Sequence, residues 1–290
     1  MKRFNTVLYG AFLGAAFLAM AAPASAVPVP VVCPAAGATV DLTTASATTT
    51  INDAIYTSAD SSGTVGTGVF PAFVKINGND TCISGYNTDG TLEFDTSNSP
   101  LIMFTLDTMD VVSQGGIDYF EFILDINQEK NDPLLSLDNV QIFYSTSSTL
   151  TGWSDCKLDN DTVSTLDDVQ CVYSMDAGTN SSVLLNYTLN NGSGNGFDMS
   201  LLVPTSKFAG VVDPSTTYVY LYSAFGSVGG AYAENDGPEE WAYRRCPEGE
   251  VCFVPPPPPD TNVPEPSTLV LLAAAFAGAV GSRRRTRKTA

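Results

Sequence analysis

The sequence predicts an all-β fold, an antiparallel β-sandwich of the jelly-roll type. Three observations predict it. Short runs rich in Val, Ile, Thr, Tyr and Phe recur along the chain, and this composition is typical of strands. Turns rich in Gly, Asn and Ser separate these runs, most clearly at 190–196 (NNGSGNG). Between the two ends of the chain, no segment has the apolar period of a helix, and no fixed repeat favours a solenoid.

In the first part of the chain, the runs with strand character are 48–51, 69–76, 91–95 and 101–107. Residues 48–51 (TTTI) could open a strand. Pro71 places the second run at a sheet edge or a bulge. Residues 91–95 (TLEFD) alternate apolar and polar side chains, and 101–107 (LIMFTLD) has the length of a buried strand.

The strongest strands are expected in the middle, at 119–126 (YFEFILDI) and 140–144 (VQIFY). A polar segment, 127–139, separates them. Because side chains alternate along a strand, Val140, Ile142 and Tyr144 should share one face and Gln141 and Phe143 the other.

Later strands are expected at 169–174, 182–189, 197–203 and 217–225, with a short one around Trp241. The run 217–225 (TYVYLYSAF) is rich in Tyr, Val and Thr, as strands are.

The two ends carry export signals. Lys2 and Arg3 precede an apolar stretch at 7–20 and an Ala24-Ser25-Ala26 cleavage site, which together indicate a secretory signal peptide over 1–26. Signal peptidase is therefore an expected partner. The exported β-domain then spans 27–253, and a proline-rich stalk follows at 254–262, with five consecutive prolines at 255–259.

The C-terminal segment 263–288 has three parts in order. It begins with the motif Val263, Pro264, Glu265, Pro266 and Ser267, continues with an uncharged apolar run at 269–280, and ends in a basic cluster. The apolar run is short for the roughly 20 residues of a membrane span. Arginines after it favour a cytoplasmic end, so that the motif faces outward.

This segment resembles the PEP-CTERM sorting signal of bacteria that have an outer membrane and an exopolysaccharide. The resemblance implies a transient inner-membrane anchor through the C-terminal helix. It also implies cleavage by an exosortase, a membrane-embedded cysteine protease, and delivery to the cell surface or the extracellular space.

Charge and composition exclude several functions. Of the 31 acidic residues, only Glu265 lies in the C-terminal segment and none lies in the signal peptide. Seven of the 13 Lys and Arg lie in these two ends. Residues 27–262 therefore hold 30 acidic and six basic residues, a net charge of −24. Such a surface excludes nucleic acid as a partner. The chain has no histidine, which removes Ser-His-Asp and Cys-His mechanisms.

Six cysteines in an exported chain indicate disulfides. They are Cys33, Cys82, Cys156, Cys171, Cys246 and Cys252. Six cysteines allow 15 connectivities, and the sequence does not choose among them. Sequence neighbours suggest Cys156–Cys171 and Cys246–Cys252, which leaves Cys33–Cys82.

Two acidic segments are candidates for calcium, the only cofactor that the sequence suggests. Asp125, Asn127 and Glu129 alternate as calcium ligands do, but the EF-hand pattern fails because Lys130 and Ser136 stand where it needs Gly and Glu. Asp155, Asp159 and Asp161 lie between or beside Cys156 and Cys171, where close carboxylates would favour a divalent ion. The alternative for both is a solvated acidic loop.

Glu239 and Glu240 beside Trp241 imitate a glycosidase pair with a sugar-stacking ring. A glycosidase needs two carboxyls that face each other, whereas adjacent residues of a strand point to opposite faces. Trp153 and Trp241 could each stack on a sugar, or belong to the core.

Inside the domain, three segments are similar to stretches of other exported proteins with this sorting tail, β-rich domains of unassigned activity. They are 124–128 (LDINQ), 135–138 (LSLD) and 235–241 (NDGPEEW). The resemblance assigns no functional residue.

We therefore expect a non-enzymatic exported protein with a structural or adhesive role in biofilm or exopolysaccharide. The alternatives are a carbohydrate-binding module, which predicts an exposed aromatic platform, and a glycoside hydrolase built on carboxylates alone.

Overall fold

The computed structural model describes residues 33–59, 72–99, 101–153, 169–190 and 197–255, and these residues form two β-sheets. Sheet A has the order β1 (Ala38–Asp41), β10 (Ser181–Asn186), β8 (Leu134–Ser145), β12 (Tyr218–Phe225) and β5 (Ile83–Tyr86), with β9 (Gln170–Ser174) also paired to β8. Sheet B has the order β2 (Thr48–Ile51), β3 (Ala54–Ser58), β11 (Met199–Pro204), β7 (Ile117–Asp125), β13 (Glu239–Tyr243) and β4 (Ala72–Ile76), with β6 (Val111–Gln114) also paired to β7.

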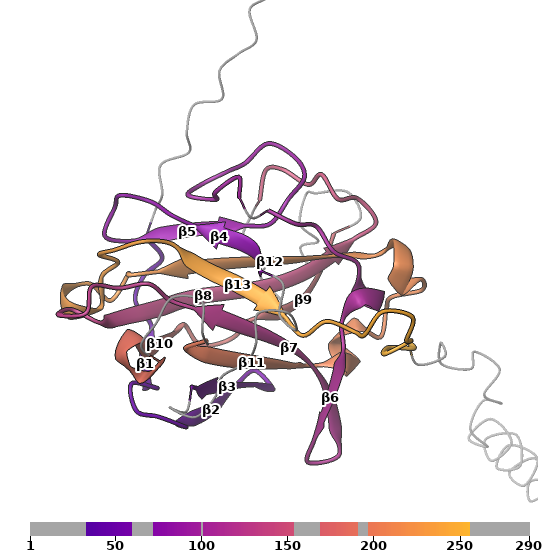
Figure 1. Ribbon diagram of the computed structural model, residues 1–290, viewed down its shortest axis with the longest axis horizontal. Helices are drawn as coiled ribbons and strands as arrows, with labels where there is room; N and C mark the ends of the chain where they lie inside the picture. Colours follow the sequence, from indigo (N-terminus) through magenta and orange to yellow (C-terminus); the bar gives the residue numbers. More distant parts are fainter. Residues whose placement is uncertain (1–32, 60–71, 100, 154–168, 191–196, 256–290) are drawn as a thin grey trace, which may run out of the picture.

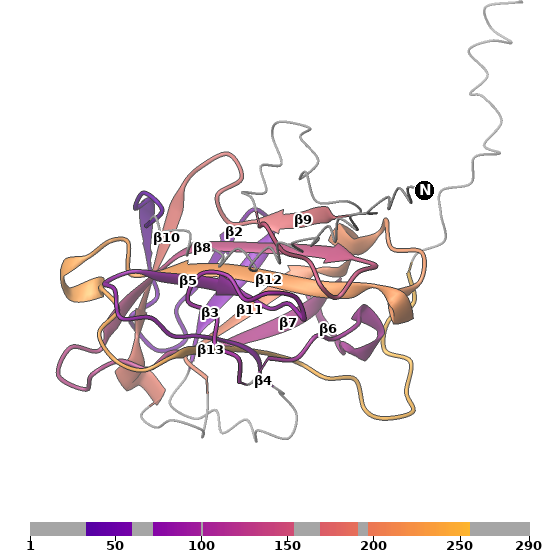
Figure 2. The ribbon, with the colours of Figure 1, turned by 90° about the horizontal axis from the view of Figure 1, so that it is seen from above.

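The two sheets stack face to face, with β8 and β12 in one layer and β7 and β13 in the other (Figure 2). The β6–β7 hairpin projects from this body (Figure 1). Short 3₁₀ helices lie in the connections, at η1 (Leu106–Thr108), η2 (Tyr187–Asn190), η3 (Thr205–Phe208), η4 (Pro214–Thr216) and η5 (Gly230–Tyr232).

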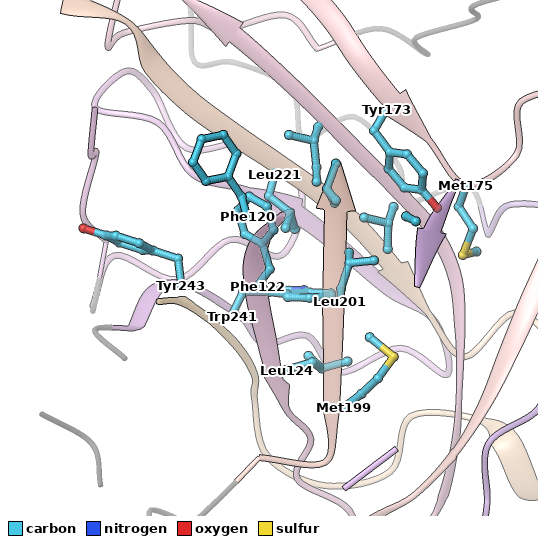
Figure 3. Packing of buried hydrophobic residues seen from close by; sticks show 14 of the residues in the cluster. Phe120, Phe122, Leu124, Tyr173, Met175, Met199, Leu201, Leu221, Trp241 and Tyr243 are labelled. Carbon is cyan, nitrogen blue, oxygen red and sulfur yellow. The ribbon is translucent and has the colours of Figure 1, made fainter. Parts of the chain in front are cut away.

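One continuous hydrophobic core fills the space between the sheets. Period-2 alternation sends every second side chain of each strand inward, so that β7 contributes Phe120, Phe122 and Leu124 (Figure 3). Trp241 on β13 is fully buried among them, and its Nε1 donates to the Ser223 hydroxyl on β12 at 2.9 Å. This bond joins sheet B to sheet A through the core.

The predicted β-rich fold with two sheets is confirmed. Strands of the structure correspond to the expected strands 48–51, 119–126, 140–144, 169–174, 197–203, 217–225 and the one around Trp241. Two more are met in part: residues 72–76 of the expected strand 69–76 form β4, and residues 182–186 of the expected strand 182–189 lie in β10, while 187–189 belong to the 3₁₀ helix η2. Val140 and Ile142 lie in the core and Phe143 on the opposite face, as the alternation predicted. Pairing is antiparallel except between β1 and β10, which are parallel. The jelly-roll path stays a prediction.

Two expected strands are wrong. Residues 101–107 alternate between the sheets, because Ile102 N–H donates to the Phe73 carbonyl of β4 while the Phe104 carbonyl accepts from Val219 of β12. A segment that divides its backbone bonds in this way joins neither ladder. Residues 91–95 fail to extend because Phe94 has a φ of 56°, in the left-handed region.

Two disulfides lie within the described residues. Cys33–Cys82 and Cys246–Cys252 each join Cα atoms 5.8 Å apart. The second is a pairing that the sequence neighbours suggested, and the first is the pair that this suggestion left over. Cys171 is also disulfide-bonded, and Cys156 lies outside the described residues.

Candidate functional site

Two of the three segments that resemble stretches of other exported proteins, 124–128 and 235–241, meet at one edge of sheet B. β7 ends at Asp125 and β13 begins at Glu239, and the antiparallel pairing sets Asp125 opposite Glu240. β11 begins on the other side of β7, with Met199 opposite Leu124. The end of β7 and the beginnings of β11 and β13 therefore meet at one edge of sheet B.

Glu239 is the centre of this site. Its carboxyl is fully buried and accepts two hydrogen bonds, from Asn127 N–H at 2.9 Å and from Gln128 Nε2 at 3.1 Å. Burial, together with the nearby carboxyls of Glu234 and Asp198, holds the pKa of Glu239 well above its ordinary value. The structure thus brings several carboxyl groups into a water-poor environment.

Asp198 lies directly before β11 and is 3% exposed. Its Oδ2 accepts from Ile126 N–H at 2.8 Å, whereas its Oδ1 has no hydrogen-bond partner. Burial raises the pKa of Asp198 to about 8, and the adjacent Asp125 carboxyl contributes to the rise. A buried acceptor without a donor is uncommon in native proteins.

Glu234 lies at the edge of the same site. Burial, with repulsion from Asp236 and Asp95, raises its pKa to about 7. The connection between β12 and β13 that carries it is fixed by backbone bonds, including Glu234 N–H to the Thr81 carbonyl at 3.0 Å.

Asn235 holds the same connection against the end of β7. Its Oδ1 accepts from Glu129 N–H at 2.8 Å and its Nδ2 donates to the Asp132 carbonyl at 2.8 Å. Gly237 has a φ of +65° and lies so close to Asn127 that a Cβ at this position would meet its Nδ2 at 1.9 Å. This position therefore requires glycine.

Asp138, from the third segment, belongs to a neighbouring network. It is the additional residue at a bulge in β8, where the pairing with β12 passes from Asn139–Ala224 to Leu137–Phe225. Its buried carboxyl accepts from Ser136, from Ser182 and from Ser227 N–H. Burial raises its pKa, and these donors oppose the rise.

The structure places only part of the calcium candidates here. Asp125 lies beside Asp198, but Asn127 and Glu129 donate backbone N–H groups, and the Glu129 side chain is exposed. Asp155, Asp159 and Asp161 lie outside the described residues. Within the described ranges, no three or more His, Cys, Asp or Glu side chains form a group that could hold a metal ion.

Sequence reasoning missed that Gln128 and Asp198 both interact with Glu239. Alternation could have found two of them, because Glu239 shares a face with the core residue Trp241, and Gln128 shares a face with the core residue Ile126. Asp198 gave no such signal, because its position depends on how β11 pairs with β7.

The supposed glycosidase pair points in opposite directions. Glu239 faces inward, while Glu240 faces outward and forms a salt bridge of 3.0 Å with Lys75. Trp241 lies in the core, and Trp153 is half-buried and stacks on Tyr222 with ring centroids 3.8 Å apart. Among the exposed large hydrophobic side chains of the described residues, none is aromatic.

The outer face of sheet B carries two shallow hollows. One, of about 320 Å³, is lined by Glu121, Ser200 and Arg244 among others, and the next, of about 380 Å³, by Tyr119 and Lys207 among others. Arg244 Nε donates to Glu121 at 2.6 Å, and the Ser200 hydroxyl donates to the same carboxyl at 3.0 Å. This polar face differs from the acidic surface that the sequence predicts.

Comparison with known proteins assigns the C-terminal segment. A family model of the PEP-CTERM protein-sorting motif matches residues 262–285, a range that includes Val263 to Ser267, so the resemblance is confirmed. No curated protein and no solved structure matches the chain. The matched residues and the predicted membrane helix lie outside the described residues, and none of the helices within those residues has the length and hydropathy to cross a membrane.

Proposed function

We propose that this chain, which carries a PEP-CTERM protein-sorting motif, is a structural or adhesive protein of the cell surface or extracellular matrix. The motif implies export and processing by an exosortase. It is the observation that carries the proposal, because it defines the destination independently of the domain's fold.

The domain's properties support this role. A two-sheet body with a continuous hydrophobic core between its sheets and with disulfides suits a protein that persists outside the cell. Its excess of 24 negative charges over 27–262 keeps free copies apart and lets divalent cations bridge them within a matrix. Exopolysaccharide and biofilm are the proposed surroundings, in a bacterium with an outer membrane. The protein has no proposed enzymatic activity.

The test follows the protein through export in a host with and without its exosortase. With the enzyme, we expect a product of lower mass at the surface or in the medium. Without it, the chain should stay in the inner-membrane fraction with its C-terminal segment attached. Pro264→Ala with Glu265→Ala should reproduce the second result, whereas Glu250→Ala, outside the motif, should not. Equal processing and location in both hosts would refute the sorting step.

The adhesive role needs its own measurement. Cells that lack the protein should retain less matrix on a surface, and the complete chain should restore retention, whereas the unprocessed variant should not. Normal matrix retention without the protein would refute the adhesive role and leave the sorting step intact.

Carbohydrate binding is the second candidate function, and the outer face of sheet B is the observation that favours it. Its hollows offer a carboxylate, a guanidinium and hydroxyl groups, which suit the hydroxyls of a neutral glycan. Glu121→Gln should weaken retention on a column of matrix polysaccharide, while Glu240→Gln on the same face should not. Equal retention of both variants and the parent chain would contradict this assignment.

A further inference from the structure

The outer face of sheet A carries a row of aromatic side chains. Tyr218, Tyr220 and Tyr222 alternate along β12, so they share one face of the strand, whereas Val219 and Leu221 between them point into the core. The tyrosines belong to a second hydrophobic cluster, separate from the core between the sheets. Four large side chains packed against this cluster are only partly buried, namely Phe94, Met103, Trp153 and Tyr218. The outer face of sheet A therefore has an apolar surface that is partly open to solvent.

Trp153 presents one face of its ring at this surface. The other face stacks on Tyr222, with ring centroids 3.8 Å apart and an angle of 13° between the planes. Phe94 lies beside this stack and not on top of it, because its centroid is almost equally far from Trp153 (5.7 Å) and from Tyr222 (6.1 Å). Among the described residues, no other ring contacts Trp153. The exposed area of the half-buried indole therefore lies on the side away from Tyr222.

Two local costs accompany this arrangement. The Trp153 Nε1 is buried without an acceptor, although buried polar groups are hydrogen-bonded in the great majority of native structures. Phe94 has a φ of 56°, a left-handed conformation that is an outlier for a bulky residue. Backbone strain of this kind is concentrated at functional sites. Two such costs in residues that touch each other indicate a function beyond packing.

Hydrogen bonds hold the rings in place. The Glu93 carboxylate accepts from the Tyr86 hydroxyl at 2.5 Å. It also accepts from Gly152 N–H at 2.9 Å and from Trp153 N–H at 3.2 Å. The connection after β5, which carries Phe94, is thereby tied to the connection after β8, which carries Trp153. A surface that is fixed before a ligand arrives loses less conformational entropy on binding.

Charge decides which molecules can approach this surface. Residues 27–262 carry a net charge of −24, so nucleic acid, an anionic glycan and a second copy of the domain are all repelled. A neutral sugar is not repelled. The C–H bonds on the face of a sugar ring carry partial positive charge, which is attracted to the negative face of an aromatic ring.

We propose that Trp153, Phe94 and Tyr218 form a binding surface for a neutral polysaccharide. The step from Tyr218 to Tyr222 along β12 spans roughly 13 Å, which is longer than one sugar ring and suits a chain of sugars. The proposal rests on the matrix location proposed above. It is separate from the hollows of sheet B, because the outer faces of two stacked sheets point in opposite directions (Figure 2).

The test uses the full-length protein, purified in mild detergent, and the neutral fraction of the matrix polysaccharide from its own cells. Trp153 and Trp241 are the two tryptophans of the chain, and Trp241 is fully buried. Acrylamide should therefore quench the fluorescence of Trp153 and spare that of Trp241. The neutral fraction should protect Trp153 from quenching in a saturable manner, whereas the acidic fraction of the same matrix should not.

Variants locate the contact. Trp153→Ala should weaken retardation in an electrophoresis gel that contains the neutral fraction by about tenfold in affinity, the change expected for one stacked ring. Trp153→Phe keeps a ring and should lose less. Tyr218→Ala keeps both tryptophans, so it should shift the protection of Trp153 to higher polysaccharide concentrations. Glu121→Gln, on the outer face of sheet B, should leave that protection unchanged, which separates this surface from the hollows.

Three results would overturn the proposal. The first is a Trp153 that no neutral polysaccharide protects, in a protein that is still delivered to the matrix. The second is protection that appears on raising the protein concentration alone, which would make a second copy the occupant. The third is unchanged binding in both Trp153→Ala and Tyr218→Ala, which would place the glycan elsewhere on the domain.

Discussion

The titration of Asp198 should make stability depend on pH, and Asp198→Asn should remove the Asp198 contribution while the contributions of Glu239 and Glu234 remain. The folded-state pKa of about 8 lies above the ordinary value of 3.8. Between these values the folded state binds the proton and the unfolded state does not, so stability falls as pH rises from about 4 to about 8. The difference between the two pKa values corresponds to a free energy on the order of 5 kcal/mol.

The variant does not recover all of that energy. The amide oxygen introduced by Asp198→Asn would still accept from Ile126 N–H, but the variant loses a charge-assisted hydrogen bond worth roughly 1.5–3 kcal/mol. At pH 9, without metal, we therefore expect Asp198→Asn to be more stable than the wild type by about 2–4 kcal/mol. Near pH 5 the wild-type carboxyl is protonated, so the two proteins should agree within about 1 kcal/mol.

Urea unfolding in the presence of a chelator, followed by tryptophan fluorescence at pH 5, 7 and 9, measures the difference. Glu240→Gln is the matched control, because its half-exposed salt bridge with Lys75 is worth at most about 1 kcal/mol at every pH. A stability difference that does not change with pH, or a less stable variant at pH 9, would refute the reasoning.

Three further predictions concern the core, the disulfides and the turn at the site. Ser223→Ala should cost about 1–3 kcal/mol in urea unfolding because it leaves the buried Trp241 Nε1 without an acceptor, whereas Ser206→Ala in the exposed part of η3 should cost less than about 0.5 kcal/mol; equal costs would count against the bond between the sheets. Replacing Cys33 and Cys82 with Ala should lower the free energy of unfolding by about 4 kcal/mol, and replacing Cys246 and Cys252 with Ala should lower it by about 2 kcal/mol. The difference is expected because the first disulfide closes a separation of 49 residues and the second a separation of 6. A larger loss of Tm for the second pair than for the first would contradict the chain-entropy argument. Gly237→Ala should lower Tm by more than Gly115→Ala, because both have positive φ but only Gly237 would clash with Asn127; similar losses would show that the close packing is unimportant.

Much of the fold could be predicted because most strands are local patterns. Residues 119–126 and 217–225 combine β-branched and aromatic side chains in an order that any sheet would accept, and alternation placed Val140 and Phe143 on the correct faces. Residues 101–107 have the same composition but divide their backbone bonds between β4 and β12. No local sequence pattern indicates that a segment will share its backbone hydrogen bonds between two sheets.

Only part of the candidate site could be predicted from the sequence, for a related reason. The segment that contains Asp125 drew attention as an alternating acidic loop, but its partners lie far along the chain. Asp198 reaches it through the pairing of β11 with β7, and Glu239 through the pairing of β13 with β7. Register between distant strands depends on the whole sheet.

The most direct test of the account is the intact mass of the native protein recovered from the surface or medium of its own cells. Export and sorting predict a chain that begins at Val27, ends within or next to 263–267 and carries no free thiol. A cytosolic chain that still ends at Ala290, with all six cysteines reduced, would contradict it.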